Sequence, residues 1–441
     1  MRTFESPFSP WDLFKALYGN SDSSFFLDSA GSPAKGPAYS YLGAHPFAEL
    51  RMDRDGLFLK EGRRQRQYPV SKLSGLLRSL LKKYRPKKRS RLPFFSGGAV
   101  GFLGYEMAAF FEKKVRFRKK PKPQTPFLYF GFYRDLIVYD HRKKKYFELG
   151  SRRRPLITGT LEVKNERFHV HRFHAEMSEG QFKGMITKAK RFIKAGDIYQ
   201  SNLSQRFSFE FSGSPLALYE QSREINPSPF AAYLSLGDLK LISNSPERLV
   251  SKRNRLCETK PIAGTKPIGV SPKALKLNPK ERAEHIMLVD LERNDLGRVC
   301  DYHSIRVKEL MKIEKYSHLM HLVSTLTGTL KKNCDGWDLL RAVFPGGTIT
   351  GCPKIRCMEI IDELEPVGRG LYTGSLGYFG FDGDLDFNIV IRTLILKRNR
   401  GWLQVGAGIV QDSDPRLEYE ETLHKGEALC EALVRASVEK G

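Results

Sequence analysis

Residues 198–211, IYQSNLSQRFSFEF, strongly constrain the fold because apolar and polar residues alternate along them. A period of two is typical of a β-strand, whose successive side chains point to opposite faces. One face has Tyr199, Leu203, Phe207, Phe209 and Phe211, and the other has Gln200, Asn202, Arg206 and Glu210. The polar face lies either in solvent or along the wall of a polar cavity, and the alternation fits both.

A helix is expected directly before this strand, since residues 182–197 place their apolar side chains on one helical face and end near Gly196. Further strands are expected at 371–381, 387–396 and 401–410, and further helices at 279–295, 352–365 and 415–437. Strands and helices interleave without regular βαβ alternation, which predicts an α+β fold with large, mainly antiparallel sheets. A composition change near 151–170 separates an N-terminal region, 1–165, from residues 166–441.

The composition indicates a globular protein, with 441 residues of which 40% are hydrophobic. No run of about 18 apolar residues is present, so no membrane span is expected. The first residues lack a basic segment followed by an apolar one, so no signal peptide is expected. Six scattered cysteines without a C-x-x-C pair are typical of a reduced, cytoplasmic protein without a cysteine-rich zinc site.

The formal net charge is +25, and many of the basic residues lie before residue 173. The runs 85–91, 116–122 and 151–155 are interrupted by prolines and are typical of exposed loops. This pattern favours a basic solvated surface that suits an acidic partner. Sequence-independent binding to nucleic acid phosphates is the less favoured alternative.

Two pairs of carboxylates share one spacing on expected helices: Glu281 with Glu284, and Glu418 with Glu421. Residues three apart point to one side of a helix, so the two pairs could hold a hard cation such as Mg²⁺. Ordinary surface glutamates are the alternative. Lys425 follows Glu421 by four residues, which fits either an exposed ion pair or an ammonium placed beside an anionic ligand.

Three glycine- or proline-rich segments are candidate site loops. Residues 344–354, FPGGTITGCPK, do not match an ATP-binding P-loop, because Cys352 and Pro353 stand where Lys and Ser/Thr are needed. Residues 405–410, VGAGIV, form either a tight turn or a bare backbone surface that donates N–H groups to a carboxylate. Residues 258–269 form a stiff loop with Ala263, Gly264 and Thr265 at its crest.

These segments occur in an order that resembles the chorismate-utilising enzymes, and in particular their aminating members. The resemblance is dense over residues 170–437 and looser at 27–30, 39–46 and 97–106. It is based on motifs such as GDIYQSNLSQRF, NSPERLV, PIAGT, KERAEHIMLVDLERNDLGRV, FPGGTITGCPK, GAGIVQDSDP and EYEETLHK. The resemblance implies two large sheets packed face to face with helices outside, the N-terminal region in the same sandwich, and an active site in the cleft.

The resemblance also implies roles for particular residues. Glu284 and Glu421 would bind Mg²⁺ directly, with Glu281 and Glu418 supporting it through waters. The groups that would hold the enolpyruvyl and carboxylate groups of chorismate are Arg392, Tyr372, Lys425 and the backbone of Gly406, Ala407 and Gly408. His321 and Thr348 would line the ring pocket, and Glu247, which follows Pro246, would protonate the departing 4-hydroxyl. From the residues alone, a structural hydrogen bond is the alternative for Glu247.

Gln200 favours amination. Family members that add water to chorismate carry a lysine base at this strand position, whereas ammonia is already a nucleophile and needs no base. No glutaminase motif is visible in the chain, so the resemblance implies a separate glutamine amidotransferase subunit as the source of ammonia.

Ala263 conflicts with the other motifs about the product. Many members that make 4-amino-4-deoxychorismate, for para-aminobenzoate and folate, have a nucleophilic lysine here, whereas members that make anthranilate have alanine. The motifs at residues 198–207, 226–234, 344–351 and 385–393 instead resemble the para-aminobenzoate branch. We therefore expect 4-amino-4-deoxychorismate, formed without a lysine intermediate or with Lys260 or Lys266 as substitute. Anthranilate is the alternative, and a non-catalytic nucleic-acid-binding protein on the same scaffold is a remote one.

Overall fold

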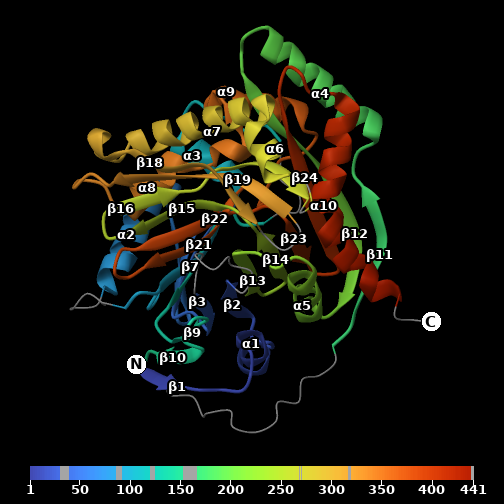
Figure 1. Cartoon of the computed structure of the whole chain (residues 1–441). Coiled ribbons are helices and arrows are strands. Elements are labelled where there is room, and N and C mark those ends of the chain that lie inside the picture. The colour runs from blue at the N-terminus through green and yellow to red at the C-terminus, as the bar shows by residue number, and fades with distance from the viewer. Residues whose placement is uncertain are drawn as a thin grey trace.

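The computed structural model describes residues 1–29, 39–85, 92–119, 125–151, 166–267, 269, 271–315 and 319–438. Two large sheets dominate it, and their described strands pair antiparallel (Figure 1). The first sheet has the order β1 (Arg2–Phe4), β10 (Lys145–Leu149), β9 (Leu136–Asp140), β3 (Tyr39–Ala44), β2 (Ser23–Asp28), β13 (Phe230–Leu236), β14 (Leu239–Ser245), β23 (Thr393–Lys397), β24 (Arg400–Ile409), β12 (Gln200–Gly213) and β11 (Phe168–Ala175), with β20 (Gly351–Cys352) beside β12.

The second sheet has the order β17 (Ile262–Pro267), β19 (Leu319–Thr329), β16 (Leu256–Thr259), β15 (Arg248–Arg253), β22 (Leu385–Ile389), β21 (Ser375–Gly380), β7 (Gly98–Leu103), β8 (Leu128–Tyr133), β4 (Ala48–Asp53), β5 (Gly56–Glu61) and β6 (Arg64–Tyr68), with β18 (Arg306–Lys315) beside β19. The described helices are α1 (Pro10–Tyr18), α2 (Leu73–Lys83), α3 (Ala108–Phe111), α4 (Glu179–Lys194), α5 (Pro215–Ile225), α6 (Pro272–Leu277), α7 (Pro279–Gly297), α8 (Gly336–Val343), α9 (Lys354–Leu364) and α10 (Pro415–Val438). Short 3₁₀ turns occupy η1 (Val70–Lys72), η2 (Tyr105–Met107), η3 (Tyr302–Ser304) and η4 (Gly347–Ile349).

The two sheets pack face to face, with helices on their outer sides. The layer between the sheets is apolar and contains Phe25 and Leu234 from the first sheet and Val100 and Tyr129 from the second. The outer core of the first sheet includes Trp11, Tyr219 and Leu429 from α1, α5 and α10. The outer core of the second sheet includes Leu77, Val289 and Leu340 from α2, α7 and α8. The predicted α+β sandwich is therefore confirmed.

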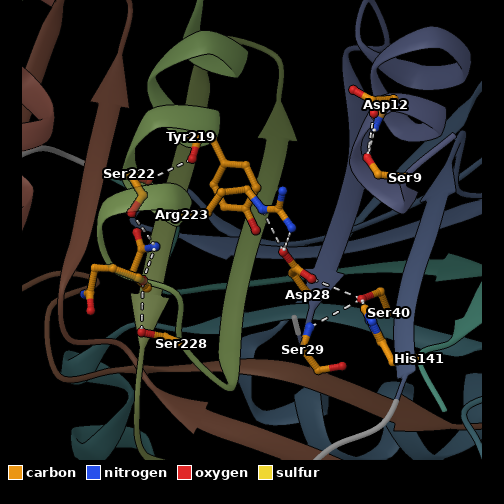
Figure 2. Close-up of polar contacts among 12 residues, drawn as sticks. Ser9, Asp12, Asp28, Ser29, Ser40, His141, Tyr219, Ser222, Arg223 and Ser228 are labelled. Carbon is orange, nitrogen blue, oxygen red and sulfur yellow. Dashed lines mark hydrogen bonds and ion pairs between the residues drawn. The ribbon is translucent and has the colours of Figure 1, made fainter. Parts of the chain in front are cut away.

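Both sheets contain strands from before and after residue 166, and in each sheet the two groups form separate blocks that meet at one junction. Strand β2 pairs with β13 at Leu27↔Ala232, and β7 pairs with β21 at Gly101↔Gly377. Across the first of these junctions, Arg223 Nε donates to Asp28 Oδ2 at 2.9 Å, as Figure 2 shows. Ser40 Oγ lies 3.1 Å from Asp28 Oδ1 and 2.7 Å from His141 Nε2. Both segments of the chain therefore contribute to one polar network and to both sheets.

Strand β12 is buried on both faces over its first half. Helix α4 begins at the Ser178 capping box and packs Phe182 and Ile186 against Leu203 on the apolar face. The polar face is also covered, since Gln200, Asn202 and Arg206 are all buried. Solvent exposure, one of the two interpretations of this face, is therefore wrong for these residues. The start of β12 forms part of a buried polar wall.

The stretch 387–396 is not the single strand that its apolar residues predict. It contains the end of β22 in the second sheet and the start of β23 in the first. The chain crosses between the sheets at residues 390–392, and Arg392 has a positive φ of 50°. Both halves are apolar because both face buried layers, so their composition does not reveal the crossing. The crossing carries Arg392 into the space between the sheets.

No helix within the described residues is both long and apolar enough to cross a membrane.

Candidate active site

The predicted site residues lie on segments from both sheets and from helices α7 and α10. Gln200 and residues 406–408 belong to β12 and β24, Ala263 and Thr265 to β17, and His321 to β19. Thr348 lies in η4, Glu247 lies between β14 and β15, and Tyr372 precedes β21. Helix α7 packs against β17 and β19, and α10 packs against β24. Residues distant in sequence are therefore gathered where these segments meet.

Two glycines of β24, Gly406 and Gly408, bring the backbone close to polar side chains. Asn202 pairs with Gly408, and Ser204 with Gly406. A Cβ at Gly406 would lie 2.7 Å from Tyr372 Oη and 2.8 Å from Asn202 Oδ1, and one at Gly408 would lie 2.5 Å from Gln200 Nε2. Residues 405–409 are thus a strand interior and not the tight turn that was one interpretation of this segment. Larger residues at 406 and 408 would displace these polar groups.

Unpaired polar atoms lie along the same wall. Within the described part of the chain, the buried Oε1 of Gln200 and Oδ1 of Asn202 have no hydrogen-bond partner. Buried polar atoms are normally paired, and leaving one unpaired is costly. Such atoms are suited to a polar ligand at this wall. Ala407, by contrast, is fully buried among apolar residues of α4 and β12, so only its backbone can serve the site.

Lys425 connects α10 to this wall. Its Nζ donates to the backbone carbonyl of Gly406 at 3.2 Å and pairs with Glu421 Oε1 at 2.7 Å. The expected i,i+4 ion pair is therefore present, and the ammonium also reaches the β24 backbone. The ion-pair interpretation of Lys425 is confirmed, and a role beside an anionic ligand stays a prediction.

His321 lies near two cations. Burial, together with the nearby Arg392 and Lys425, lowers its pKa to about 3. The imidazole is therefore neutral at physiological pH. On the neighbouring strand, Ala263 pairs with Leu322 and Thr265 with His321, with a bulge at Gly264. Gly264 has a φ of 57°. The side chain of Thr265 lies outside the described part, so only its backbone position is known.

Glu247 is buried beside Arg392. Burial and, to a smaller extent, the Glu292 carboxyl raise the pKa of Glu247, and its net value is about 8. The Thr348 hydroxyl, the Ile262 amide and the Arg392 guanidinium act in the opposite direction. The Ile262 amide donates to Glu247 Oε1 at 3.4 Å. Glu247 therefore carries a proton at neutral pH. Of the two interpretations of Glu247, this state is compatible with a general acid.

The four metal-ligand candidates do not form a preassembled metal cluster. Within the described residues, no three His, Cys, Asp or Glu side chains are close enough to hold a metal ion. Glu418 is buried and accepts a hydrogen bond from Ser413 Oγ at 2.6 Å. The stiff loop expected at 258–269 is wrong for residues 262–267, which form strand β17 with a bulge at Gly264. Glu281 lies beside this bulge, because a Cβ at Gly264 would come within 2.8 Å of Glu281 Oε2.

The donor chemistry nevertheless fits Mg²⁺. This cation takes one or two carboxylates and completes its shell with waters and substrate oxygens, so three preassembled protein ligands are not required. Glu284 and Glu281 belong to α7, and Glu421 and Glu418 to α10. The glycine at 264 leaves room for the Glu281 carboxylate at the bulge of β17, which is consistent with a site assembled together with the substrate.

Two buried charged residues that sequence reasoning missed hold the polar wall in place. The Arg369 guanidinium donates to Glu365 Oε1 at 2.8 Å and to the carbonyl of Asn202 at 2.6 Å. The same Glu365 oxygen accepts from the amide of Ser204 at 2.9 Å. The available signal was the motif MEIIDELEP, which ends at Pro366, followed by an arginine between two glycines. A third missed residue is Glu292, which lies beside Glu247.

A large cavity lies next to the site but is not lined by it. It has a volume of about 920 Å³, and its described lining residues include Tyr41, Tyr378, Arg253 and Lys260. None of the predicted site residues is among the described residues that line it. Because Lys260 faces this cavity, the structure does not favour it as a replacement for the family lysine. The side chain of Lys266 lies outside the described part.

Comparisons with known proteins agree with this geometry. The sequence pattern described as chorismate binding enzyme matches residues 22–431. Aminodeoxychorismate synthase component 1 of Bacillus subtilis (strain 168) is 42% identical, covering 91% of this chain and 90% of that protein. Anthranilate synthase component 1 of Acetivibrio thermocellus is 36% identical, covering 99% and 95%.

A solved structure has the same architecture. The crystal structure of anthranilate synthase component I from Streptococcus pneumoniae TIGR4 superposes with a TM-score of 0.79 at 34% sequence identity. It covers 90% of this chain and 93% of that one. The resemblance inferred from the motifs is therefore confirmed over nearly the whole chain.

Proposed function

Because the chain belongs to the family of chorismate binding enzymes, we propose that it replaces the 4-hydroxyl of chorismate with ammonia, giving 4-amino-4-deoxychorismate. The proposal rests chiefly on the buried, protonated Glu247 beside Arg392, with an amide and no amine at position 200. The similarity to aminodeoxychorismate synthase component 1 over 91% of the chain supports it.

A continuous series of neighbours can hold the substrate. Glu247 lies near Arg392, Arg392 and Lys425 lie near His321, and Lys425 contacts Gly406. Gly406 in turn lies against Tyr372 and Asn202. Arg392 and Lys425 supply positive charge for the carboxylates of chorismate, and Tyr372 and the β24 backbone supply hydrogen bonds. His321 and Thr348 line the ring, where a neutral imidazole adds no charge.

Proton transfer from Glu247 makes water the leaving group. The nitrogen of ammonia forms a bond to C4 while the C4–O bond breaks, and the Glu247 proton leaves with the oxygen as water. The new ammonium then returns a proton to the Glu247 carboxylate. Bound Mg²⁺ would neutralise the ring carboxylate of chorismate, held directly by Glu284 and Glu421 and through waters by Glu281 and Glu418.

The nucleophile needs no protein base. Gln200 cannot take a proton from water, which disfavours hydration of chorismate at this position. Ala263 offers no nucleophile, and Lys260 faces the neighbouring cavity. In this proposal ammonia attacks the ring directly, without a covalent lysine intermediate, and Lys266 is the remaining candidate for the alternative with such an intermediate.

Anthranilate is the second candidate product, and Ala263 is the specific observation that favours it. In this alternative the nitrogen of ammonia bonds to C2 while the C4–O bond breaks and the Glu247 proton leaves with the 4-hydroxyl as water. Loss of the C2 proton and of the enolpyruvyl group as pyruvate then makes the ring aromatic. The same residues hold the substrate in both cases. The choice depends on which ring carbon faces the incoming nitrogen near Ala263, so product analysis decides between the two.

Ammonia requires a separate source, and we propose a glutamine amidotransferase subunit. The isolated chain is expected to consume chorismate with ammonium chloride and Mg²⁺ but not with glutamine. Glutamine is expected to support turnover only after a glutaminase subunit is added. Chorismate loss is followed by chromatography, with tetramethylammonium chloride at equal ionic strength as the control for salt. Glutamine-dependent turnover by the pure chain would contradict the two-subunit assignment.

A further inference from the structure

Two buried carboxyls, Glu247 and Glu292, lie between the same two segments of the chain. The Ile262 amide contacts Glu247, and Thr259 Oγ1 contacts Glu292 Oε2 at 3.0 Å. On the other side, Thr348 lies near Glu247, and a Cβ at the adjacent Gly347 would lie 3.4 Å from Glu292 Oε1. Residues 259–262 and 347–348 therefore flank both carboxyls, which are 5% and 3% exposed.

The Thr259 hydroxyl links Glu292 to the backbone of Leu249, two residues after Glu247. Thr259 Oγ1 lies 2.8 Å from the carbonyl oxygen of Leu249 and 3.0 Å from Glu292 Oε2. A hydroxyl has one hydrogen, and neither a carbonyl nor a carboxylate can donate. If Thr259 donates to Leu249, the contact with Glu292 is satisfied when the Glu292 carboxyl donates to Thr259.

We propose that Glu292 is a positioning residue that shares one buried site with Glu247, so that the two carboxyls resist ionising together and the catalytic proton stays on Glu247 into alkaline conditions. The inference rests on the proposed function of Glu247 as proton donor. Ionising both carboxyls of one buried site is unfavourable, because the two negative charges repel each other. Such a pair therefore titrates in coupled steps. Glu292 touches neither substrate nor ammonia and acts only through Glu247.

The charged groups around the pair are few. Burial raises the pKa of Glu292 to about 7, Asp295 on the same helix also raises it, and Lys354 of α9 lowers it. Lys354 is itself paired with Asp295. Arg392 is the cation that faces Glu247. Once Glu292 ionises, its negative charge opposes loss of the proton from Glu247.

The test compares pH profiles of kcat/KM for chorismate with ammonium chloride. Glu292→Gln keeps the size and shape of the side chain, and its amide NH₂ can still donate to Thr259 Oγ1. The variant side chain carries no charge at any pH. In Glu292→Gln, the alkaline limb of the kcat/KM profile is expected to move to lower pH by roughly one unit. This is the expected effect of removing one nearby negative charge from Glu247. At about pH 6, where Glu247 holds its proton in both proteins, kcat is expected to stay within about threefold of wild type.

Two further variants make the result specific. Glu292→Asp keeps the charge and is expected to keep the alkaline limb of the wild type. Asp290→Asn, on the exposed side of the same helix, is the matched control and is expected to leave the profile unchanged. Should Glu292→Gln not fold, Glu292→Met removes the charge with an apolar residue of similar length.

The outcomes separate this inference from the proposed function. If the wild-type chain does not convert chorismate, the proposed function itself is wrong. If the wild type turns over and the neutral Glu292 variants keep its alkaline limb, only the role of Glu292 is wrong. Glu292 would then be a structural residue.

Discussion

Glu247→Gln is expected to lower kcat by roughly 10²–10⁴-fold, the usual range for loss of a general acid. The amide has nearly the same shape and can still accept from the Ile262 amide, so substrate binding is expected to persist. What it cannot do is give a proton to the departing hydroxyl. A small change in KM beside a large fall in kcat would show that the chemical step, and not binding, is affected.

The control for this prediction is Glu258→Gln on β16. Glu258 pairs with Arg248 at 2.8 Å, lies near the site and has no assigned role in chemistry. Its kcat is expected to stay close to wild type. Equal losses of kcat in Glu247→Gln and Glu258→Gln, or wild-type turnover in Glu247→Gln, would contradict the assignment of Glu247 as proton donor.

The same variant has an expected effect on stability. Glu247 has a folded-state pKa of about 8, above its ordinary value of 4.5. A raised pKa means that its favourable contribution to folding is fully present below the unfolded-state value and is lost as the pH rises towards the folded-state value. The free energy of unfolding of the wild type, relative to Glu247→Gln, is therefore expected to fall between about pH 4.5 and pH 8.

Loss of the proposed direct metal ligands is expected to have the second large effect. Glu284→Gln and Glu421→Gln are each expected to lower kcat/KM at limiting Mg²⁺ by at least roughly 100-fold. Each removes a charged ligand to the cation that neutralises the ring carboxylate. Glu281→Gln and Glu418→Gln, which would act through waters, are expected to show smaller losses that excess Mg²⁺ partly restores.

A second readout for the metal does not depend on turnover. In the presence of chorismate, Mg²⁺ is expected to raise the unfolding temperature of the wild type but not of Glu284→Gln or Glu421→Gln, because a ligand stabilises only the state that binds it. Glu427→Gln, exposed on the same helix as Glu421, is the matched control. Wild-type activity of the ligand variants at low Mg²⁺ would rule out this metal assignment.

The sequence predicted most elements of the fold but not how buried they are. Alternation at residues 198–211 correctly indicated the strand β12. It could not show that Gln200 and Asn202 face a covered wall, because residues that lie there, such as Tyr372, are far away in sequence. The crossing at Arg392 was missed for a related reason, since the two strands that it joins are both buried and equally apolar.

The site could be predicted where motifs resembled the family and not where residues act through packing. Glu247, Arg392, His321 and Lys425 were expected together, and the structure places them as neighbours. Glu292, Glu365 and Arg369 lie in recognised segments but were not singled out, because their importance comes from burial. Burial of a charged residue depends on contacts between distant segments, which spacing along the chain does not reveal.

The identity of the product tests the central claim most directly. The pure chain is incubated with chorismate, Mg²⁺ and ammonium chloride, and the products are separated by chromatography. The account predicts 4-amino-4-deoxychorismate, which an added lyase would convert to para-aminobenzoate, and it predicts that Ala263→Lys retains this product. Anthranilate as the main wild-type product, recognised by its fluorescence, would contradict the account and would mean that Ala263 determines where nitrogen enters the ring.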